Sequence, residues 1–333
     1  SNGAMLVTVL SCGLLLALAL FLWRHYSGKK YLSPRGRKVL ITGCDSGIGL
    51  QLACHLAENG FTVIATCLKP SSLGHELFQQ FSNIKPIVMD VTSDESIYQA
   101  KEKIFEGSFQ KDLWALINNA GVLIYGEFDW LTKDHCQRQI LVNVEGNFKV
   151  TKYFLPHLKA AKGRILNISS VNGGCAFPGT AVYSGTKFAI EGFSAALRHE
   201  LKKFGMKVII IQPGDYVKLT NIMAQHDQHR EEMWSGMSDD DKKCYGQYFH
   251  KFHQLVAEFS GMSSPTTFQG TTLLRDVEHA LLATKPKIRY TSAPLLYRIF
   301  YTSMKYLPDN LQDSWFYFIY NSLFRLTLES QRE

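Results

Sequence analysis

The chain has 333 residues, 46% hydrophobic and 20% charged, a composition typical of a globular protein with one large or two modest domains. Its net charge of +7 is modest, and its basic residues do not alternate with aromatic ones, which argues against a nucleic-acid partner. The seven cysteines lack metal-ligand spacing, so we expect a reducing compartment and no metal site.

The chain begins with an apolar segment. No residue from Met5 to Trp23 carries a formal charge, and this run approaches the ~20 residues that span a bilayer. We interpret it as a retained membrane anchor within residues 1–36. A cleaved signal peptide and a buried helix are the alternatives, but no basic leader precedes the run. Basic residues follow it at 24, 29, 30, 35, 37 and 38, so the positive-inside rule leaves the globular part in the cytosol.

A glycine-rich turn follows the first predicted strand. Residues 38–42 form an apolar run, and an apolar helical pattern begins after the turn. Glycines let the backbone approach a pyrophosphate, whose charge is favourable at a helix N-terminus. The spacing Gly-x-x-x-Gly-x-Gly differs from the commoner Gly-x-Gly-x-x-Gly. The turn residues expected to contact a dinucleotide are Gly43, Asp45, Ser46, Gly47, Ile48 and Gly49.

Strands and helices alternate along the rest of the chain. Further strands are expected at 61–66, 84–89, 113–117, 163–170 and 288–291, and a helix at about 94–105. This alternation predicts an α/β fold with a doubly wound, Rossmann-like parallel sheet that binds ligands at the carboxyl ends of its strands. The residues expected at those ends are Cys67, Asp90, Val91, Asn119, Ala120, Gly121, Pro213 and Gly214. One cofactor cleft would account for all of them.

Tyr183 and Lys187 are four residues apart, a spacing that places them on one face of a helix. A phenol titrates near ~10, and a neighbouring ammonium can lower that pKa, so the pair suits proton transfer. Ser170 ends the strand upstream, where its hydroxyl is expected to hold a substrate oxygen. The same spacing recurs elsewhere in the chain, so two solvated side chains are the alternative for the pair alone.

In their order and spacing, these motifs resemble the short-chain dehydrogenase/reductase family over about residues 37–290. The motifs are the glycine turn, Asn118-Asn-Ala-Gly121, Asn143, Ser170, Tyr183-x-x-x-Lys187 and Pro213-Gly214. Longer stretches, such as Leu113-Trp-Ala-Leu-Ile-Asn-Asn-Ala-Gly121, look like the branch of retinol, 17-beta-hydroxysteroid and 3-hydroxybutyrate dehydrogenases.

The resemblance implies a role for each catalytic residue. Tyr183 would take the alcohol proton while a hydride passes to the nicotinamide, and Ser170 would bind the reacting oxygen. These two residues would therefore also bind the substrate. Tyr183 and Lys187 would also bind the cofactor, with Lys187 holding the nicotinamide ribose. Asn143 would position a water that links Lys187 to solvent. No metal is implied.

The choice of cofactor depends on the end of the second strand. In NAD-preferring relatives an acidic residue commonly stands there, whereas NADP enzymes place Arg or Lys there or in the glycine turn. This chain has Cys67, followed by Lys69. The branch that it resembles favours NAD, with NADP as the alternative.

We expect one catalytic domain over residues 37–292, with residues 215–265 forming a lid over the substrate. A solvated helical insertion is the alternative for that segment. Residues 293–333 are rich in aromatic side chains, which are typical of a membrane interface or of packing against a partner subunit.

The resulting hypothesis is a membrane-anchored oxidoreductase for a lipophilic alcohol or carbonyl, a retinoid or a steroid. One alternative is a small hydroxy acid dehydrogenase of the 3-hydroxybutyrate type, and another is a cofactor-binding scaffold without turnover. We expect the anchor to lie in the endoplasmic reticulum membrane, with the catalytic domain facing the cytosol. The resemblance also allows a homodimer, because helix faces in this family often pair.

Overall fold

The computed structural model describes residue 13 and residues 31–70, 73–107 and 112–328. Except for Gly13, the predicted anchor from Met5 to Trp23 lies outside these residues, so it stays a prediction. Among the residues that are described, no helix is long and apolar enough to cross a membrane.

Seven parallel strands form one sheet, in the order β3-β2-β1-β4-β5-β6-β7. Their bounds are β1 Lys38–Ile41, β2 Thr62–Cys67, β3 Ile84–Val88, β4 Ala115–Asn118, β5 Arg164–Ile168, β6 Lys207–Pro213 and β7 Arg289–Ser292. The order runs outward from β1 to β3 and then returns to β4, which confirms the doubly wound parallel sheet. The reversal between β1 and β4 leaves a crevice at their carboxyl ends, where such sheets bind ligands.

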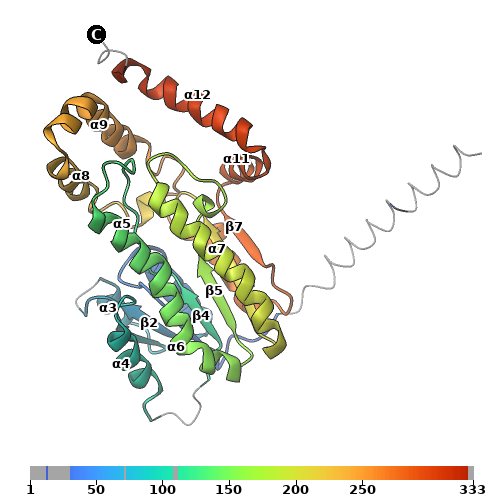
Figure 1. Cartoon of the computed structure of the whole chain (residues 1–333). Helices are drawn as coiled ribbons and strands as arrows, with labels where there is room; N and C mark the ends of the chain where they lie inside the picture. The colour runs from blue at the N-terminus through green and yellow to red at the C-terminus, as the bar shows by residue number, and fades with distance from the viewer. Residues whose placement is uncertain (1–12, 14–30, 71–72, 108–111, 329–333) are drawn as a thin grey trace, which may run out of the picture.

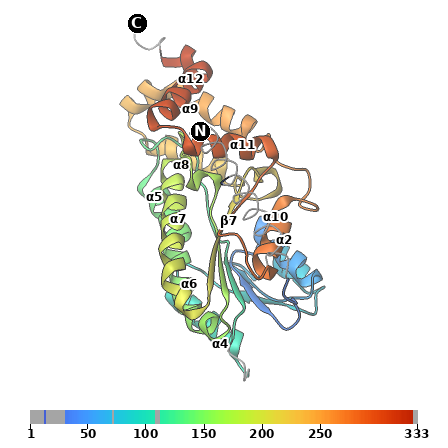
Figure 2. The same cartoon turned by 90° about the vertical axis from the view of Figure 1, so that its right-hand side faces the viewer.

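Helices cover both faces of this sheet, and Figure 2 shows the layers from the side. Helices α2 (Gly47–Glu58) and α10 (Thr272–Leu282) pack on one face, and α4 (Asp94–Phe105), α6 (Asn147–Ala160) and α7 (Ala181–Leu201) on the other. Each helix buries one apolar stripe, such as Leu52, Ala53 and Leu56 of α2. The remaining helices are α3 (Leu73–Phe78), α5 (Lys133–Ile140), α8 (His226–Gly236), α9 (Asp239–Phe259), α11 (Leu295–Tyr306) and α12 (Asp309–Leu328).

The predicted elements are mostly confirmed. Helix α4 has the bounds expected from the sequence, and Ser93 caps it by accepting a hydrogen bond from the Ser96 amide. The fourth strand begins two residues later than expected, at Ala115. Helix α3 was not expected.

Helices α8 and α9 of the predicted lid (residues 215–265) and the C-terminal helices α11 and α12 lie together at the carboxyl end of the sheet (Figure 1). Helices α8 and α9 enclose their own apolar cluster around Trp130, Met233 and Phe249. Asp215 joins both ends of the lid, because its carboxylate accepts bonds from the amides of Val217 at 3.2 Å and Ser263 at 2.9 Å. Residues 215–265 therefore form a folded helical unit whose two ends meet at Asp215.

Candidate active site

A cavity of about 1390 Å³ opens at the carboxyl ends of the strands, beneath the lid and the C-terminal helices. Most of the site residues predicted from the sequence line it: Gly43, Asp45, Ser46, Gly47, Ile48, Asp90, Val91, Asn119, Ala120, Gly121, Ser170, Tyr183, Lys187, Pro213 and Gly214. Residues far apart in the sequence thus meet around one space, as a single cofactor and substrate cleft requires.

The glycine turn forms a cradle at the start of α2. Gly43 and Gly47 have φ of +68° and +58°, values that favour glycine. A Cβ on Gly49 would stand 2.2 Å from the Gly43 carbonyl oxygen, so the turn closes only with glycine there. The Ser46 side chain makes no capping bond, and no acidic residue lies in the first turn of α2. The positive end of the helix dipole therefore meets the cavity uncompensated, which fits a pyrophosphate.

The turn after β4 is bonded to this cradle. The Thr42 hydroxyl accepts bonds from the amides of Asn119 at 2.9 Å and Ala120 at 3.0 Å. The Asn119 side chain donates in return to the carbonyls of Thr42 and Gly43 at 2.8 and 3.0 Å. These bonds hold the two loops that line the crevice at a constant separation.

Ser170, Tyr183 and Lys187 meet at the inner end of the cavity, and all three are buried. The Ser170 hydroxyl bonds to the Tyr183 phenol. The Lys187 ammonium donates to the Ile168 carbonyl at 3.1 Å and lies 5.5 Å from the centre of the Tyr183 ring. The tyrosine and lysine lie on one side of α7, as their spacing predicted.

Burial dominates the titration of this group. It raises the pKa of Tyr183, against the opposite effect of the Ser170 hydrogen bond, and it lowers the pKa of Lys187 to about 8. The predicted lowering of the tyrosine pKa by Lys187 therefore stays a prediction, because burial sets the direction of the shift in the protein on its own. The ammonium is bonded to a carbonyl rather than to the phenol, and burial disfavours its charge.

Asn143 lies behind the cavity wall, in a π-helical turn at Leu141–Gly146 that separates α5 from α6. Its amide accepts a bond from the Val122 amide at 2.8 Å and donates to the Thr186 hydroxyl at 3.1 Å. A Cβ on Gly121 would lie 3.3 Å from the Asn143 oxygen and 3.7 Å from the Lys187 ammonium nitrogen. Asn143 thus braces the loop beside Lys187.

Two residues expected at the cofactor do not line the cavity. Gly49 lies beneath the turn, where it allows the close approach described above. Cys67 is 0% exposed, and its side chain packs in the core between α2 and the sheet. The next two residues, Leu68 and Lys69, line the cavity in its place.

Three tyrosines in the cavity wall were not expected there. Tyr125 follows β4, and Tyr297 and Tyr301 belong to α11, in the segment predicted to lie at a membrane or a partner. The Tyr297 hydroxyl donates to that of Tyr301 at 3.3 Å, and burial raises the pKa of Tyr297 to about 12. The four-residue spacing of the pair was a signal that these two side chains share one helix face.

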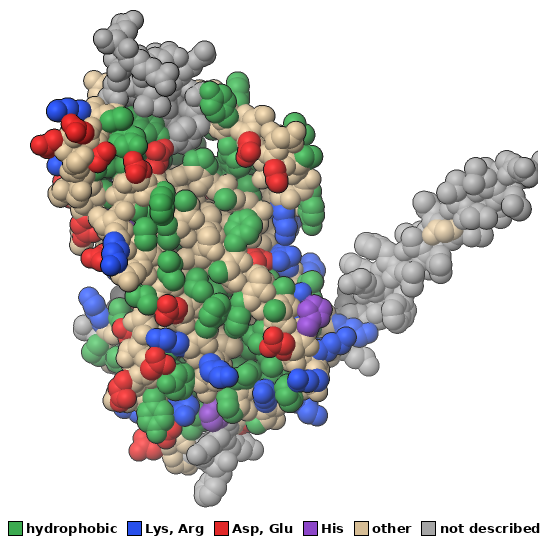
Figure 3. All heavy atoms as spheres, in the orientation of Figure 1, with side chains coloured by type: hydrophobic (Ala, Val, Ile, Leu, Met, Phe, Trp, Pro, Cys, Tyr) green, Lys and Arg blue, Asp and Glu red, His purple; other side chains and the backbone are tan. Residues whose placement is uncertain are grey.

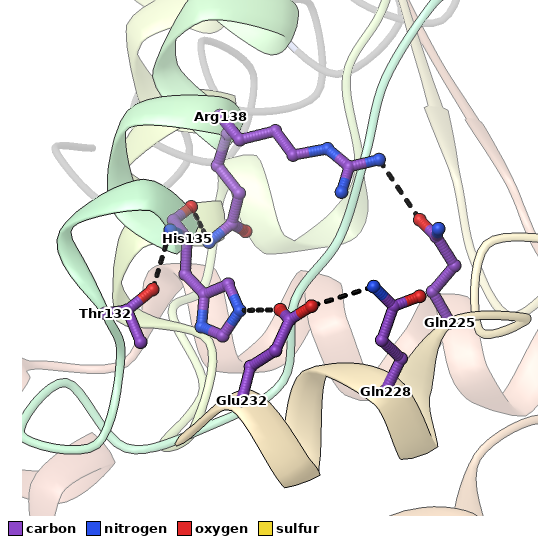
Figure 4. Close-up of polar contacts among 7 residues, drawn as sticks. Thr132, His135, Arg138, Gln225, Gln228 and Glu232 are labelled. Atoms are coloured by element: carbon purple, nitrogen blue, oxygen red, sulfur yellow. Dashed lines mark hydrogen bonds and ion pairs between the residues drawn. The ribbon is translucent and has the colours of Figure 1, made fainter. Parts of the chain in front are cut away.

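Polar contacts fasten the lid helix α8 to α5, as Figure 4 shows. The His135 ring lies 2.7 Å from the carboxylate of Glu232, which also accepts a bond from Gln228 at 2.8 Å. Arg138 donates to the side chain of Gln225 at 3.1 Å. Because Arg138 and Gln225 both line the cavity, this contact closes its wall between the lid and the sheet domain.

Comparison with known proteins agrees with this geometry. Residues 37–231 match the family model described as short chain dehydrogenase. The chain therefore belongs to the short-chain dehydrogenase family of NAD(P)-dependent oxidoreductases.

The chain is similar to both a hydroxysteroid dehydrogenase and a hydroxybutyrate dehydrogenase. The chain is 36% identical over 304 residues to 17-beta-hydroxysteroid dehydrogenase type 6 of Bos taurus, covering 88% of this chain and 92% of that protein. It is 32% identical over 287 residues to the mitochondrial D-beta-hydroxybutyrate dehydrogenase of Mus musculus, covering 84% and 83%.

Solved structures of short-chain dehydrogenases share the fold. One from Streptomyces avermitilis has a TM-score of 0.63 and 25% identity, covering 80% of this chain and 91% of that one. A gluconate 5-dehydrogenase from Burkholderia cenocepacia, in complex with NADP and tartrate, has a TM-score of 0.51 and 28% identity, covering 57% and 74%.

Proposed function

We propose that this short-chain dehydrogenase transfers hydride between a nicotinamide cofactor and a lipophilic alcohol or its carbonyl form, a retinoid or a steroid. The observation that carries the proposal is the apolar part of the lining of the cavity that also contains Ser170 and Tyr183. It consists of Phe177, Phe252, Leu255, Val256, Phe259, Phe316 and Ile319. Such a lining suits an apolar ligand whose orientation is set by a few polar groups. The similarity to a hydroxysteroid dehydrogenase supports the same substrate class.

In the proposed mechanism, the bound nicotinamide supplies or accepts the hydride. Tyr183 removes the proton from the alcohol oxygen, or returns it to the carbonyl oxygen. Ser170 donates a hydrogen bond to the same oxygen and so holds it at the phenol. Lys187 would hold the ribose hydroxyls of the bound cofactor and relay the proton, and Asn143 would position a water that links Lys187 to solvent. General acid and base help of this kind contributes ~10²–10⁴-fold to the rate.

The positions of the basic residues around the cavity argue for an apolar substrate rather than a small hydroxy acid. A carboxylate would require a lysine or arginine beside Ser170. Within the described part of the chain, the cavity is lined by three such residues, Lys69, Arg138 and Lys187. Lys69 follows β2, Arg138 bonds to the lid, and Lys187 donates to a backbone carbonyl. The 3-hydroxybutyrate hypothesis is therefore the second candidate, supported by the similarity to that dehydrogenase.

We further propose that the protein works at the endoplasmic reticulum membrane, with its catalytic domain in the cytosol. Two features support this: the uncharged segment Met5–Trp23 and the apolar outer sides of α11 and α12. Among the described residues, the exposed large hydrophobic ones of these two helices are Leu295, Leu296, Ile299, Tyr306, Leu311, Trp315, Tyr317 and Phe318. Figure 3 shows hydrophobic side chains at the surface of this end of the molecule. Since α11 and α12 also line the cavity, a substrate dissolved in lipid would have a short path to Tyr183. The full chain should therefore stay in the membrane pellet after a carbonate wash, and its release would contradict this placement.

The decisive experiment measures NADH and NADPH formation by the detergent-solubilised full chain. Separate incubations contain all-trans-retinol, a panel of hydroxysteroids or 3-hydroxybutyrate, each with wild-type protein and with Tyr183→Phe. We expect turnover of a lipophilic alcohol that falls at least ~10²-fold in the variant. The dissociation constant of NADH should change less than twofold, because the phenol acts on the substrate.

Turnover of 3-hydroxybutyrate alone would replace the lipophilic substrate with the small acid. Binding of the dinucleotide without turnover of any substrate would favour the scaffold hypothesis. A Tyr183→Phe variant with wild-type activity would refute the assignment of the proton to Tyr183.

A further inference from the structure

The end of strand β2 carries no acidic residue that could bind a ribose. The strand ends at Cys67, whose side chain is fully buried in the core. The chain then passes along the cavity at Leu68 and Lys69, which are both exposed. The strand end therefore presents its backbone and the side chains of Leu68 and Lys69, but no carboxylate, at the position where a carboxylate selects NAD in dinucleotide folds.

A carboxylate reaches this position from the glycine turn instead. The two carboxylate oxygens of Asp45 accept bonds from the Leu68 amide at 3.0 and 2.9 Å. One of them also accepts a bond from the Lys69 amide at 3.2 Å. Two successive amides thus converge on one anion, an arrangement typical of a small anion-binding concavity. Here the protein fills that concavity with its own side chain.

The backbone around this contact is closely packed. The Gly74 amide donates to the Asp45 carbonyl at 3.3 Å. A Cβ on Gly74 would stand 2.2 Å from the Cys44 carbonyl oxygen, so the start of α3 lies directly against the glycine turn. The position of Asp45 is therefore set by the fold, and its carboxylate lines the same cavity as Asp90 and Asn119.

We propose that Asp45 makes this enzyme select NAD over NADP. Its carboxylate accepts the ribose hydroxyls of NAD, occupies the two amides that would otherwise bind a 2′-phosphate, and repels that phosphate by its charge. Lys69 is exposed, so water screens its opposite charge. The inference rests on the dinucleotide site of the proposed function but is independent of the substrate.

The test measures dissociation constants of NADH and NADPH for the full chain in detergent, without substrate, from the change in nucleotide fluorescence. Asp45→Asn removes the charge and keeps the shape, and Asp45→Ser also frees the two amides. Asp112→Asn is the matched control, because Asp112 pairs with Lys38 at 4.0 Å at the amino ends of β1 and β4, away from the cavity. We expect wild-type protein to bind NADH at least ~10-fold more tightly than NADPH.

In Asp45→Ser the ratio of the two dissociation constants should shift toward NADPH by roughly 10- to 100-fold, which corresponds to one or two charge-assisted hydrogen bonds. Asp45→Asn should shift it less, and Asp112→Asn should leave it unchanged. Equal weakening of both nucleotides in the Asp45 variants would overturn the inference, because it would mean that Asp45 only ties the loop. Wild-type protein that binds NADPH as tightly as NADH would also overturn it, with the dinucleotide site intact. Wild-type protein that binds neither nucleotide would overturn the proposed function as well.

Discussion

Acidification from pH 7 to pH 5 should destabilise the protein through buried histidines of the lid. His226 and His229 of α8, His253 of α9 and His135 of α5 are each less than a tenth exposed. His253 lies 3.3 Å from His226, and the rings of His135 and His229 are 5.3 Å apart. Protonation would place like charges next to each other within the contact that fastens the lid.

The magnitude follows from two of these side chains. Burial, reinforced by nearby cations, lowers the pKa of His229 to about 4 and that of His253 to about 3. In the unfolded chain both titrate near ~6.5, so the unfolded state binds more protons between pH 6.5 and 4. Stability is thus retained above pH 6.5 and lost as the pH falls through this window. The charged and titratable groups that face the two rings are His135, Arg138, His226, Arg230, Glu232 and His250.

A pH of 5 lies ~1.5 units below the pKa of each histidine in the unfolded chain, which corresponds to a loss of about 2 kcal/mol of folding stability per residue. The pair therefore costs at most about 4 kcal/mol, and relaxation of the lid lowers this to about 2–4 kcal/mol. This is a large share of the ~5–15 kcal/mol by which folded domains are stable.

Urea denaturation at pH 7 and pH 5 measures this loss. The double variant His229→Gln/His253→Phe removes both groups, and phenylalanine suits position 253 because Trp130 and Phe249 pack against that ring. Its loss between the two pH values should be less than half that of the wild type. His199→Gln, at an exposed position on α7, should behave as the wild type. An equal loss in the double variant would refute the assignment to the lid histidines.

Three further variants test the glycine turn, helix α7 and a buried arginine of the sheet. Gly49→Ala should abolish NADH binding in a fluorescence titration, since its Cβ would stand 2.2 Å from the Gly43 carbonyl oxygen. A Gly49→Ala variant that still binds NADH would contradict the role of the glycine turn in binding the cofactor. Gly185→Ala should stabilise α7 by about 0.5–1 kcal/mol in thermal unfolding, because nothing lies within 4 Å of the added Cβ. Arg164→Leu should lower the free energy of unfolding by about 2–3 kcal/mol, because the buried guanidinium donates to two carbonyls at the end of α10, and no change in urea denaturation would contradict this role.

The sheet and the cofactor side of the cavity could be predicted from the sequence because their signals are local. Buried parallel strands read as short apolar runs, and the residues that end them meet at one edge by topology alone. The glycine turn, the segment Asn119–Gly121 and the pair Tyr183 and Lys187 are of this kind. Their arrangement around one cavity follows from the strand order, with no knowledge of side-chain packing.

The part of the cavity wall that α11 and α12 form could not be predicted in the same way. Residues of α11 and α12 were assigned from composition to a membrane or a partner, and each helix proves to have two sides. Tyr297 and Tyr301 line the cavity, whereas Leu296 on the same helix is 81% exposed. The helical spacing of the residues shows which of them share a side of α11. It does not show which side faces the cavity, because that depends on how α11 and α12 pack against the rest of the protein.

The preference for NAD or NADP could not be predicted from the sequence either, because it depends on where one carboxylate lies in the folded protein. A search for an acidic residue at the end of β2 finds Cys67, and from the sequence the question of NAD or NADP stays open. The carboxylate that lies there is Asp45, which precedes the strand end by more than twenty residues and reaches it across the turn. The sheet places the glycine turn and the loop after β2 side by side, so either loop can supply a carboxylate at the same position. On the proposal made above, Asp45 of the glycine turn therefore selects NAD as an acidic residue at the end of β2 would.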